Sequence, residues 1–84
     1  MPTTNQKQLN DTPARVLFGL ALRKAREEQK LSQEQLAERA GLHRTYIGQV
    51  ERGERNISID NLEHLACAVG LNAWEMIRPS KSDS

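Results

Sequence analysis

Apolar residues recur along this chain with the three- and four-residue spacing of amphipathic helices, separated by residues that start or end helices. The first such segment begins at Thr12-Pro13, because threonine is a good cap and a proline in the first turn loses no amide hydrogen bond. Its core face combines Phe18, Leu22, Ala25 and Gln29. The spacing predicts a helix over residues 13–29.

A second apolar face on the same segment is formed by Val16 and Leu20, which lie about 160° and 200° from Phe18 around a helix. Two interpretations stay open for this face. One is the partial exposure of two aliphatic side chains, which is ordinary in soluble proteins, and the other is contact with a second subunit.

Residues 31–53 read LSQEQLAERAGLHRTYIGQVERG and contain two helix-start signals separated by a tight turn. Ser32 and Gln35 have the spacing of a capping box, and Leu36 and Ala40 share the apolar face of the helix that follows. Gly41 ends this helix, because glycine adopts the left-handed conformation that often follows a helix.

The helix that follows the turn has its buried stripe at Ile47 and Val50 and ends at Gly53. Its cap position holds His43, which is not one of the usual capping residues, so we expect its first turn to be less firmly fixed. Two short helices around a glycine turn, each with one apolar face, predict a helix-turn-helix.

Two more helices are predicted after residue 57. Ser58 can cap the first, whose core stripe consists of Leu62, Leu65, Ala66 and Val69. Gly70 ends it, and Asn72 can cap a short last helix over residues 73–78, before Pro79. His64 and Cys67 fall outside the core stripe, and without further ligands at metal spacing we expect no metal site and no cofactor.

Composition limits the chain to one small domain of a reducing compartment. It has 84 residues, 27% of them charged, and a single cysteine, which excludes a disulfide framework. The longest apolar run, residues 16–22, is too short to span a bilayer, so we expect a cytoplasmic protein without a membrane segment. We place the folded domain at residues 12–78, between disordered tails at 1–11 and 79–84.

The helix after the turn carries the residues suited to nucleic acid. Thr45, Gln49 and Arg52 lie opposite Ile47, with Arg44 on one shoulder. Arginine recognises guanine, glutamine recognises adenine, and threonine can contact thymine or a phosphate. The net charge is only +1, so we expect affinity to depend on a few well-placed contacts and on a dimer. The residues expected to contact bases are Arg44, Thr45 and Gln49, and those expected to hold phosphates are Gln33, Tyr46, Arg52, Arg55 and Asn56.

These motifs, LSQEQLAERAG followed by RTYIGQVERG, resemble the Cro and phage-repressor-like (XRE) family of helix-turn-helix regulators over roughly residues 18–77. Within that family, residues 44–47 together with 51–53 and Arg55-Asn56 resemble the controller proteins of restriction–modification systems. The resemblance implies an all-α, compact five-helix lambda-repressor-like domain, with the helix-turn-helix formed by its second and third helices.

The resemblance also implies contacts that periodicity alone does not give. In this family, an arginine and a glutamate at the positions of Arg26 and Glu51 form an ion pair. The resemblance therefore predicts a structural ion pair between these two residues. Related regulators dimerise through the C-terminal region, where Trp74, Met76 and Ile77 concentrate apolar surface, so we expect a homodimer with these residues at its interface.

The predicted function is a sequence-specific transcription regulator that binds double-stranded DNA as a homodimer on a two-fold, pseudo-palindromic operator. RNA polymerase is a further candidate partner. The alternative is an antitoxin-type protein-interaction module in which DNA binding is secondary; its short polar ends offer no obvious partner-binding segment. An enzyme is not expected, because the sequence has no nucleophile beside a base, no phosphate-binding glycine loop and no metal cluster.

Overall fold

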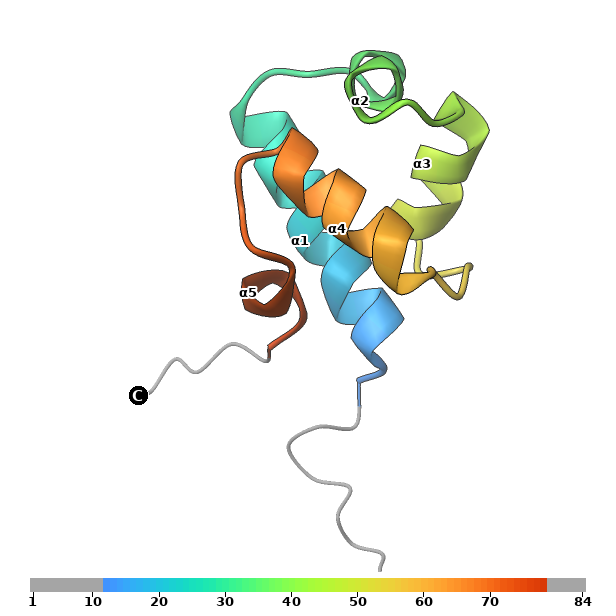
Figure 1. Ribbon diagram of the computed structural model, residues 1–84, viewed down its shortest axis with the longest axis vertical. Coiled ribbons are helices and arrows are strands. Elements are labelled where there is room, and N and C mark those ends of the chain that lie inside the picture. The colour runs from blue at the N-terminus through green and yellow to red at the C-terminus, as the bar shows by residue number, and fades with distance from the viewer. Residues whose placement is uncertain (1–11, 79–84) are drawn as a thin grey trace, which may run out of the picture.

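The computed structural model describes residues 12–78, which form five α-helices and no strand (Figure 1). The helices are α1 (Ala14–Glu28), α2 (Gln33–Ala40), α3 (Arg44–Glu51), α4 (Ile59–Ala68) and α5 (Ala73–Ile77). The predicted all-α, five-helix fold with a helix-turn-helix in its second and third helices is therefore confirmed. The tails predicted at 1–11 and 79–84, with Pro79, lie outside the described residues.

The starts of α2 and α4 follow the predicted caps, whereas Asn72 occupies the cap position of α5 without a side-chain hydrogen bond to the helix, and the cap of α1 also differs. Ser32 and Gln35 form the full capping box of α2, and the Ser58 hydroxyl accepts a hydrogen bond from the Asn61 amide at the start of α4. At α1 the cap is Pro13 and not Thr12 as predicted. Pro13 is extended (φ −60°, ψ 148°) and its carbonyl accepts the first amides of the helix, so the helix begins one residue later than expected.

The first four helices all end in the same way. The residue that leaves each helix has a positive φ, and the next amide donates to a carbonyl five residues back, which satisfies the free carbonyls of the last turn. The residues with positive φ are Lys30, Gly41, Gly53 and Gly70. After Gly41 this places Leu42 against the core, so the turn between α2 and α3 is fixed in direction.

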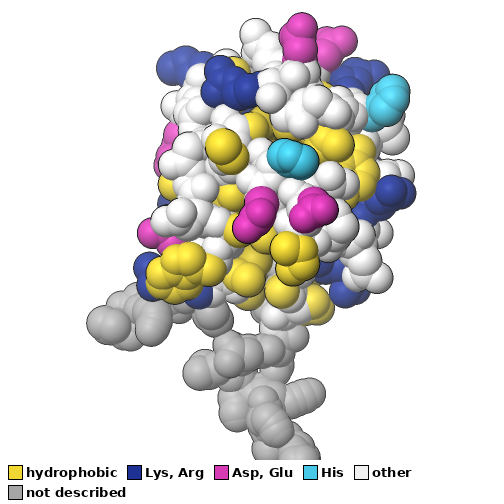
Figure 2. All heavy atoms as spheres, viewed as in Figure 1, with side chains coloured by type: hydrophobic (Ala, Val, Ile, Leu, Met, Phe, Trp, Pro, Cys, Tyr) yellow, Lys and Arg dark blue, Asp and Glu magenta, His cyan; other side chains and the backbone are white. Residues whose placement is uncertain are grey.

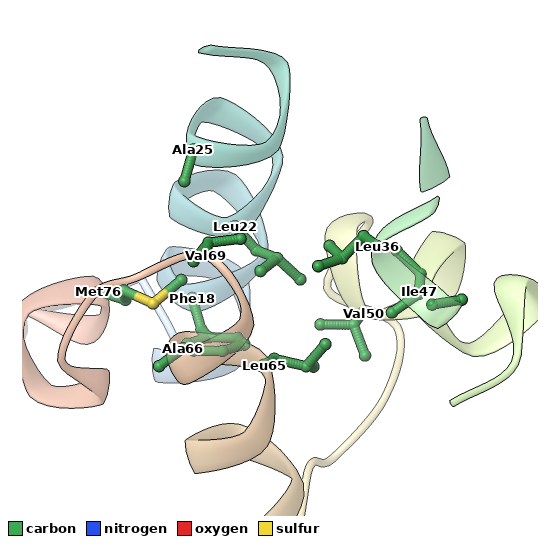
Figure 3. Packing of buried hydrophobic residues seen from close by; sticks show 11 residues of the cluster. Phe18, Leu22, Ala25, Leu36, Ile47, Val50, Leu65, Ala66, Val69 and Met76 are labelled. Carbon is green, nitrogen blue, oxygen red and sulfur yellow. The ribbon is translucent and has the colours of Figure 1, made fainter. Parts of the chain in front are cut away.

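The core lies where α1 meets the other helices, and its buried side chains point toward one another in Figure 3. The fully buried members are Phe18, Leu22, Leu36, Ile47, Val50 and Leu65. α3 and α5 each pack against α1, while α4 packs against both α2 and α5. Gln29, predicted on the core face, instead lies at the surface just past α1, where its amide donates to the Val69 carbonyl at the end of α4 (2.9 Å).

Candidate nucleic-acid interface

α3 buries one side and exposes the other. Ile47 and Val50 have no exposed surface, whereas Arg44 and Thr45 in the first turn are exposed and Gln49 is half-buried. His43 occupies the cap position of α3, and no side chain caps the first turn, in keeping with the unusual cap residue in the sequence. The three residues predicted to contact bases therefore lie on a helix whose opposite side is anchored in the core.

The C-terminal end of α3 is held by a buried ion pair. Arg26 of α1 contacts Glu51 through two hydrogen bonds, Nε to Oε2 at 2.6 Å and Nη2 to Oε1 at 3.0 Å. Glu51 is only 7% exposed, so the pair is shielded from solvent. The hydrogen bond to Glu51 raises the pKa of Arg26 and outweighs burial, which lowers it. The ion pair expected from the resemblance is present.

Gln33, at the first position of α2, joins this network. Its Nε2 donates to Oε1 of Glu51 at 3.0 Å, which uses one of its two amide protons. The side-chain oxygen of Gln33 faces Gly48 on α3, since a Cβ atom on that glycine would lie 3.6 Å from it. The ion pair thus also orients the residue predicted to hold a phosphate at the start of α2.

Arg52 lies just after α3 and bonds an acidic neighbour. Its Nε and Nη2 donate to the two oxygens of Glu54 at 2.9 and 3.2 Å, and both side chains are more than half exposed. These hydrogen bonds lower the pKa of Glu54 and raise that of Arg52. A phosphate would compete with Glu54 for this guanidinium.

Tyr46 connects α3 to the loop and to α4. Its ring is half-buried against the core, the guanidinium carbon of Arg55 lies 4.9 Å from the ring centroid, and its hydroxyl accepts a hydrogen bond from Nδ2 of Asn61 at 3.2 Å. Asn61 is not marked by any pattern in the sequence. It belongs to the first turn of α4, and only the folded arrangement of the helices brings it to the tyrosine.

The remaining predicted contact, Asn56, is exposed in the loop between α3 and α4. The start of this loop is tied to α1, because Nε of Arg15 donates to the carbonyl of Gly53 at 3.1 Å. Val16 lies against the same glycine and is half-buried, while Leu20 is 58% exposed. The second apolar face predicted on α1 is therefore split, with only Leu20 open to a partner.

The predicted subunit interface on α5 needs a correction. Trp74 is 58% exposed, but Met76 is only 3% exposed and packs in the core of its own chain. Ile77 is half-buried against that core. Met76 consequently has no surface to offer a second subunit, because the short helix uses it to seal the core. Trp74 and part of Ile77 remain candidates.

The exposed side of α4 carries two acidic residues, a histidine and a cysteine, and no lysine or arginine. Figure 2 shows a histidine and two acidic side chains in the middle of this view, with Lys and Arg side chains toward its edges. Asp60, Glu63, His64 and Cys67 line a shallow hollow there. Within residues 12–78, no three acidic, histidine or cysteine residues are placed to hold a metal ion, and no helix is long and apolar enough to cross a membrane.

Comparison with known proteins agrees with this architecture. Residues 22–73 match the family model described as helix-turn-helix. The control protein C.BamHI of Bacillus amyloliquefaciens is 44% identical over 64 residues, which cover 75% of this chain and 79% of the relative. The crystal structure of the restriction-modification controller protein C.AhdI from Aeromonas hydrophila is 47% identical with a TM-score of 0.69, covering 74% of this chain and 94% of that one.

A third similarity is to a protein solved with DNA. The restriction-modification controller protein C.Esp1396I, seen as a tetramer in complex with its natural 35 base-pair operator, is 30% identical with a TM-score of 0.70. The match covers 79% of this chain and 91% of that one.

Proposed function

Because this chain belongs to the helix-turn-helix family that its residues 22–73 match, we propose that it is a sequence-specific DNA-binding transcription regulator of the restriction–modification controller type. The observation that carries the proposal is the two-sided α3, which exposes Arg44 and Thr45 while Ile47 and Val50 anchor it in the core. A helix held in this way can enter the major groove without losing its own packing. The proposal involves no enzymatic step.

Base recognition in this proposal belongs to the exposed side of α3. Arg44 in the first turn can reach the two acceptors of a guanine, and Gln49 one turn further can pair with an adenine. Thr45 lies between them and can contact a thymine methyl group or a phosphate. The exposure of Arg44 and Thr45 supports these roles.

Phosphate contacts surround the recognition helix. Gln33 lies at the start of α2, where free amides attract anions, and Arg52, Arg55 and Asn56 follow α3. Tyr46 completes the set. Arg52, Arg55 and Asn56 are exposed, whereas Gln33 and Tyr46 are half-buried. The amide of Gln33 and the hydroxyl of Tyr46 each make one hydrogen bond within the protein and keep a proton for another contact.

The active form is a homodimer in this proposal, with one α3 in each of two successive major grooves. Half-site centres are then roughly 10 base pairs apart, or a multiple of one turn. Trp74 and the exposed part of Ile77 form the contact, and the similarity to a controller tetramer on its operator supports an oligomer on DNA. The protein acts in the cytoplasm, and RNA polymerase is a partner wherever it activates transcription.

Footprinting on the DNA upstream of its own gene tests this function. We expect a protected region with two-fold symmetry and with half-sites about one helical turn apart. The control is a scrambled sequence of the same composition at the same salt concentration, since non-specific affinity depends steeply on salt. Equal protection of both DNAs would refute sequence-specific binding.

A further inference from the structure

The first turn of α4 reaches across to the recognition helix at a single polar contact. Nδ2 of Asn61 donates to the hydroxyl of Tyr46 at 3.2 Å, and Asn61 is itself held because its backbone amide donates to Oγ of Ser58 at 3.1 Å. The donating side chain therefore extends from a well-ordered position in the capped first turn of α4. Its acceptor lies on α3, fifteen positions earlier in the chain.

We propose that Asn61 is a positioning residue for DNA binding, which acts by fixing the ring and hydroxyl of Tyr46 and, through the ring face, the guanidinium of Arg55. The proposal rests on the function proposed above. In that function Asn61 itself makes no contact with a base. Its effect passes through a tyrosine and an arginine that do contact DNA.

The direction of this hydrogen bond matters for the tyrosine. A phenol carries one proton and two lone pairs, and an amide NH₂ group can only donate. With Asn61 as the donor, Tyr46 accepts through its oxygen and keeps its own proton for a second acceptor. Phosphate oxygens are such acceptors, so the contact leaves the hydroxyl ready to donate to the DNA backbone.

The ring of Tyr46 in turn holds an arginine that the loop alone would not fix. Arg55 is exposed and belongs to no helix, and its guanidinium carbon lies 4.9 Å above the ring centroid. Stacking on an aromatic face limits the positions that this long side chain can adopt before it binds. Ordering the side chain in advance lowers the entropic cost of binding.

The test compares four proteins on the footprinted DNA: wild type, Asn61→Ala, Tyr46→Phe and the double variant. Asn61→Ala should weaken binding roughly 2- to 10-fold, the effect of one lost hydrogen bond. In the Tyr46→Phe background the same substitution should have no further effect, because the acceptor is already gone. Equal losses in both backgrounds, or wild-type affinity for Asn61→Ala, would overturn the proposal.

Ala66→Gly is the matched control for a general loosening of α4. It lowers the helix propensity of the middle of α4 by about 1 kcal/mol and should lower the melting temperature, but it leaves Ser58 and Asn61 unchanged and should change affinity by less than about twofold. If Ala66→Gly weakens binding as much as Asn61→Ala, the effect is structural and the inference is wrong.

Nuclear magnetic resonance gives a readout that does not depend on DNA. Tyr46 is the only tyrosine of the chain, so a protein with ¹³C-labelled tyrosine has a single set of ring signals. Asn61→Ala should shift the signal of the carbon that bears the hydroxyl, and Ala66→Gly should not. An unshifted signal would refute the positioning contact even if the wild type binds DNA, whereas a wild type that binds no DNA would refute the proposed function itself.

Discussion

Gly19 of α1 lies directly against the carbonyl oxygen of Val50 in the last turn of α3. A Cβ atom added to Gly19 would lie 2.3 Å from this oxygen and 2.8 Å from that of Glu51, both of them backbone atoms. Helices α1 and α3 therefore touch backbone to backbone at this point. The same contact brings Glu51 within reach of Arg26 on α1, so the depth of the crossing sets the geometry of the ion pair.

Gly19→Ala should therefore destabilise the protein even though alanine is the better helix former. The intrinsic gain is about 1 kcal/mol, but forcing α1 and α3 apart should cost about 1–3 kcal/mol or more. Gly48→Ala is the control, because the nearest atom to its Cβ is Nη1 of Arg52 at 3.2 Å, the end of an exposed side chain that can move. Thermal unfolding should show a lower melting temperature for the first variant and an unchanged or higher one for the second.

Gly19 also illustrates what the sequence pattern could not predict. Helical periodicity gave the five helices, the capping box at Ser32 and the turn at Gly41, because each depends on residues close together in the chain. A helical glycine says nothing about which backbone will approach it. That depends on how two helices cross, which local spacing does not determine.

In the candidate site, too, some features could be predicted from the sequence and others depend on contacts between helices. The exposed side of α3 follows from its period, and Arg44 and Thr45 are exposed as that period implies. The hydrogen bond from Asn61 to Tyr46 joins two helices, and the burial of Met76 depends on how α5 closes over α1. Hydrophobicity alone could not distinguish an apolar residue that seals the core from one that meets a partner.

Loss of the Arg26–Glu51 pair should be strongly destabilising. Glu51→Ala leaves a largely buried arginine without its partner, which should cost roughly 3–5 kcal/mol in the free energy of unfolding. Arg23→Ala removes an exposed pair with Glu27 and should cost less than about 1 kcal/mol, so it is the control. Urea unfolding measures both, and a Glu51→Ala protein as stable as the wild type would contradict the structural role.

The pH dependence of that stabilisation has a definite sign. Because Glu51 raises the pKa of Arg26 above its ordinary value, the arginine's contribution is complete below that ordinary pKa and is lost only as the pH rises through the higher, folded-state value. A Glu51→Gln protein, which keeps the arginine but removes the carboxylate, should therefore differ from the wild type by a constant free energy of unfolding between about pH 6 and 9.

Removal of Glu54 should strengthen DNA binding. Glu54→Gln frees the guanidinium of Arg52 and removes a negative charge beside the DNA, so affinity should rise and the slope of log affinity against log salt should steepen by up to about one unit. Glu63→Gln removes an equal charge from the exposed side of α4 and should have a smaller effect. Since Arg52 lowers the pKa of Glu54 below its ordinary 4.5, the wild-type pair is lost only as the pH falls below that value, and the difference should persist down to about pH 5.

A polar substitution at Trp74 should shift the protein from dimer to monomer. Trp74→Ser removes an aromatic side chain that is 58% exposed, so it should weaken a subunit contact with little effect on folding, whereas Ile77→Asp would also disturb the core that it touches. Ile59→Ser changes an apolar residue that is 72% exposed on α4 and is the control. Sedimentation at micromolar concentration measures the outcome, and a wild type that stays monomeric would remove the basis for a two-fold operator.

Arg44 and Arg55 should differ in what they contribute to DNA binding. Arg44 lies in the first turn of α3, so Arg44→Ala should cost about 1–3 kcal/mol on the cognate site and relax the preference at one base pair. Arg55 lies in the loop beyond α3, against the ring of Tyr46. A phosphate contact there carries no sequence information, so Arg55→Ala should weaken cognate and scrambled DNA about equally.

The dependence on salt separates these two roles. Loss of a phosphate contact releases one fewer counterion, so Arg55→Ala should flatten the slope of log affinity against log salt by roughly 0.9. Arg44→Ala should lose discrimination with a smaller change in slope, because a base contact depends on hydrogen-bond geometry as well as on charge. Lys24→Ala removes an exposed charge from α1 and serves as the control in the same titrations. If Arg44→Ala weakened both DNAs alike, Arg44 would hold the backbone, and base recognition would have to come from Thr45 and Gln49.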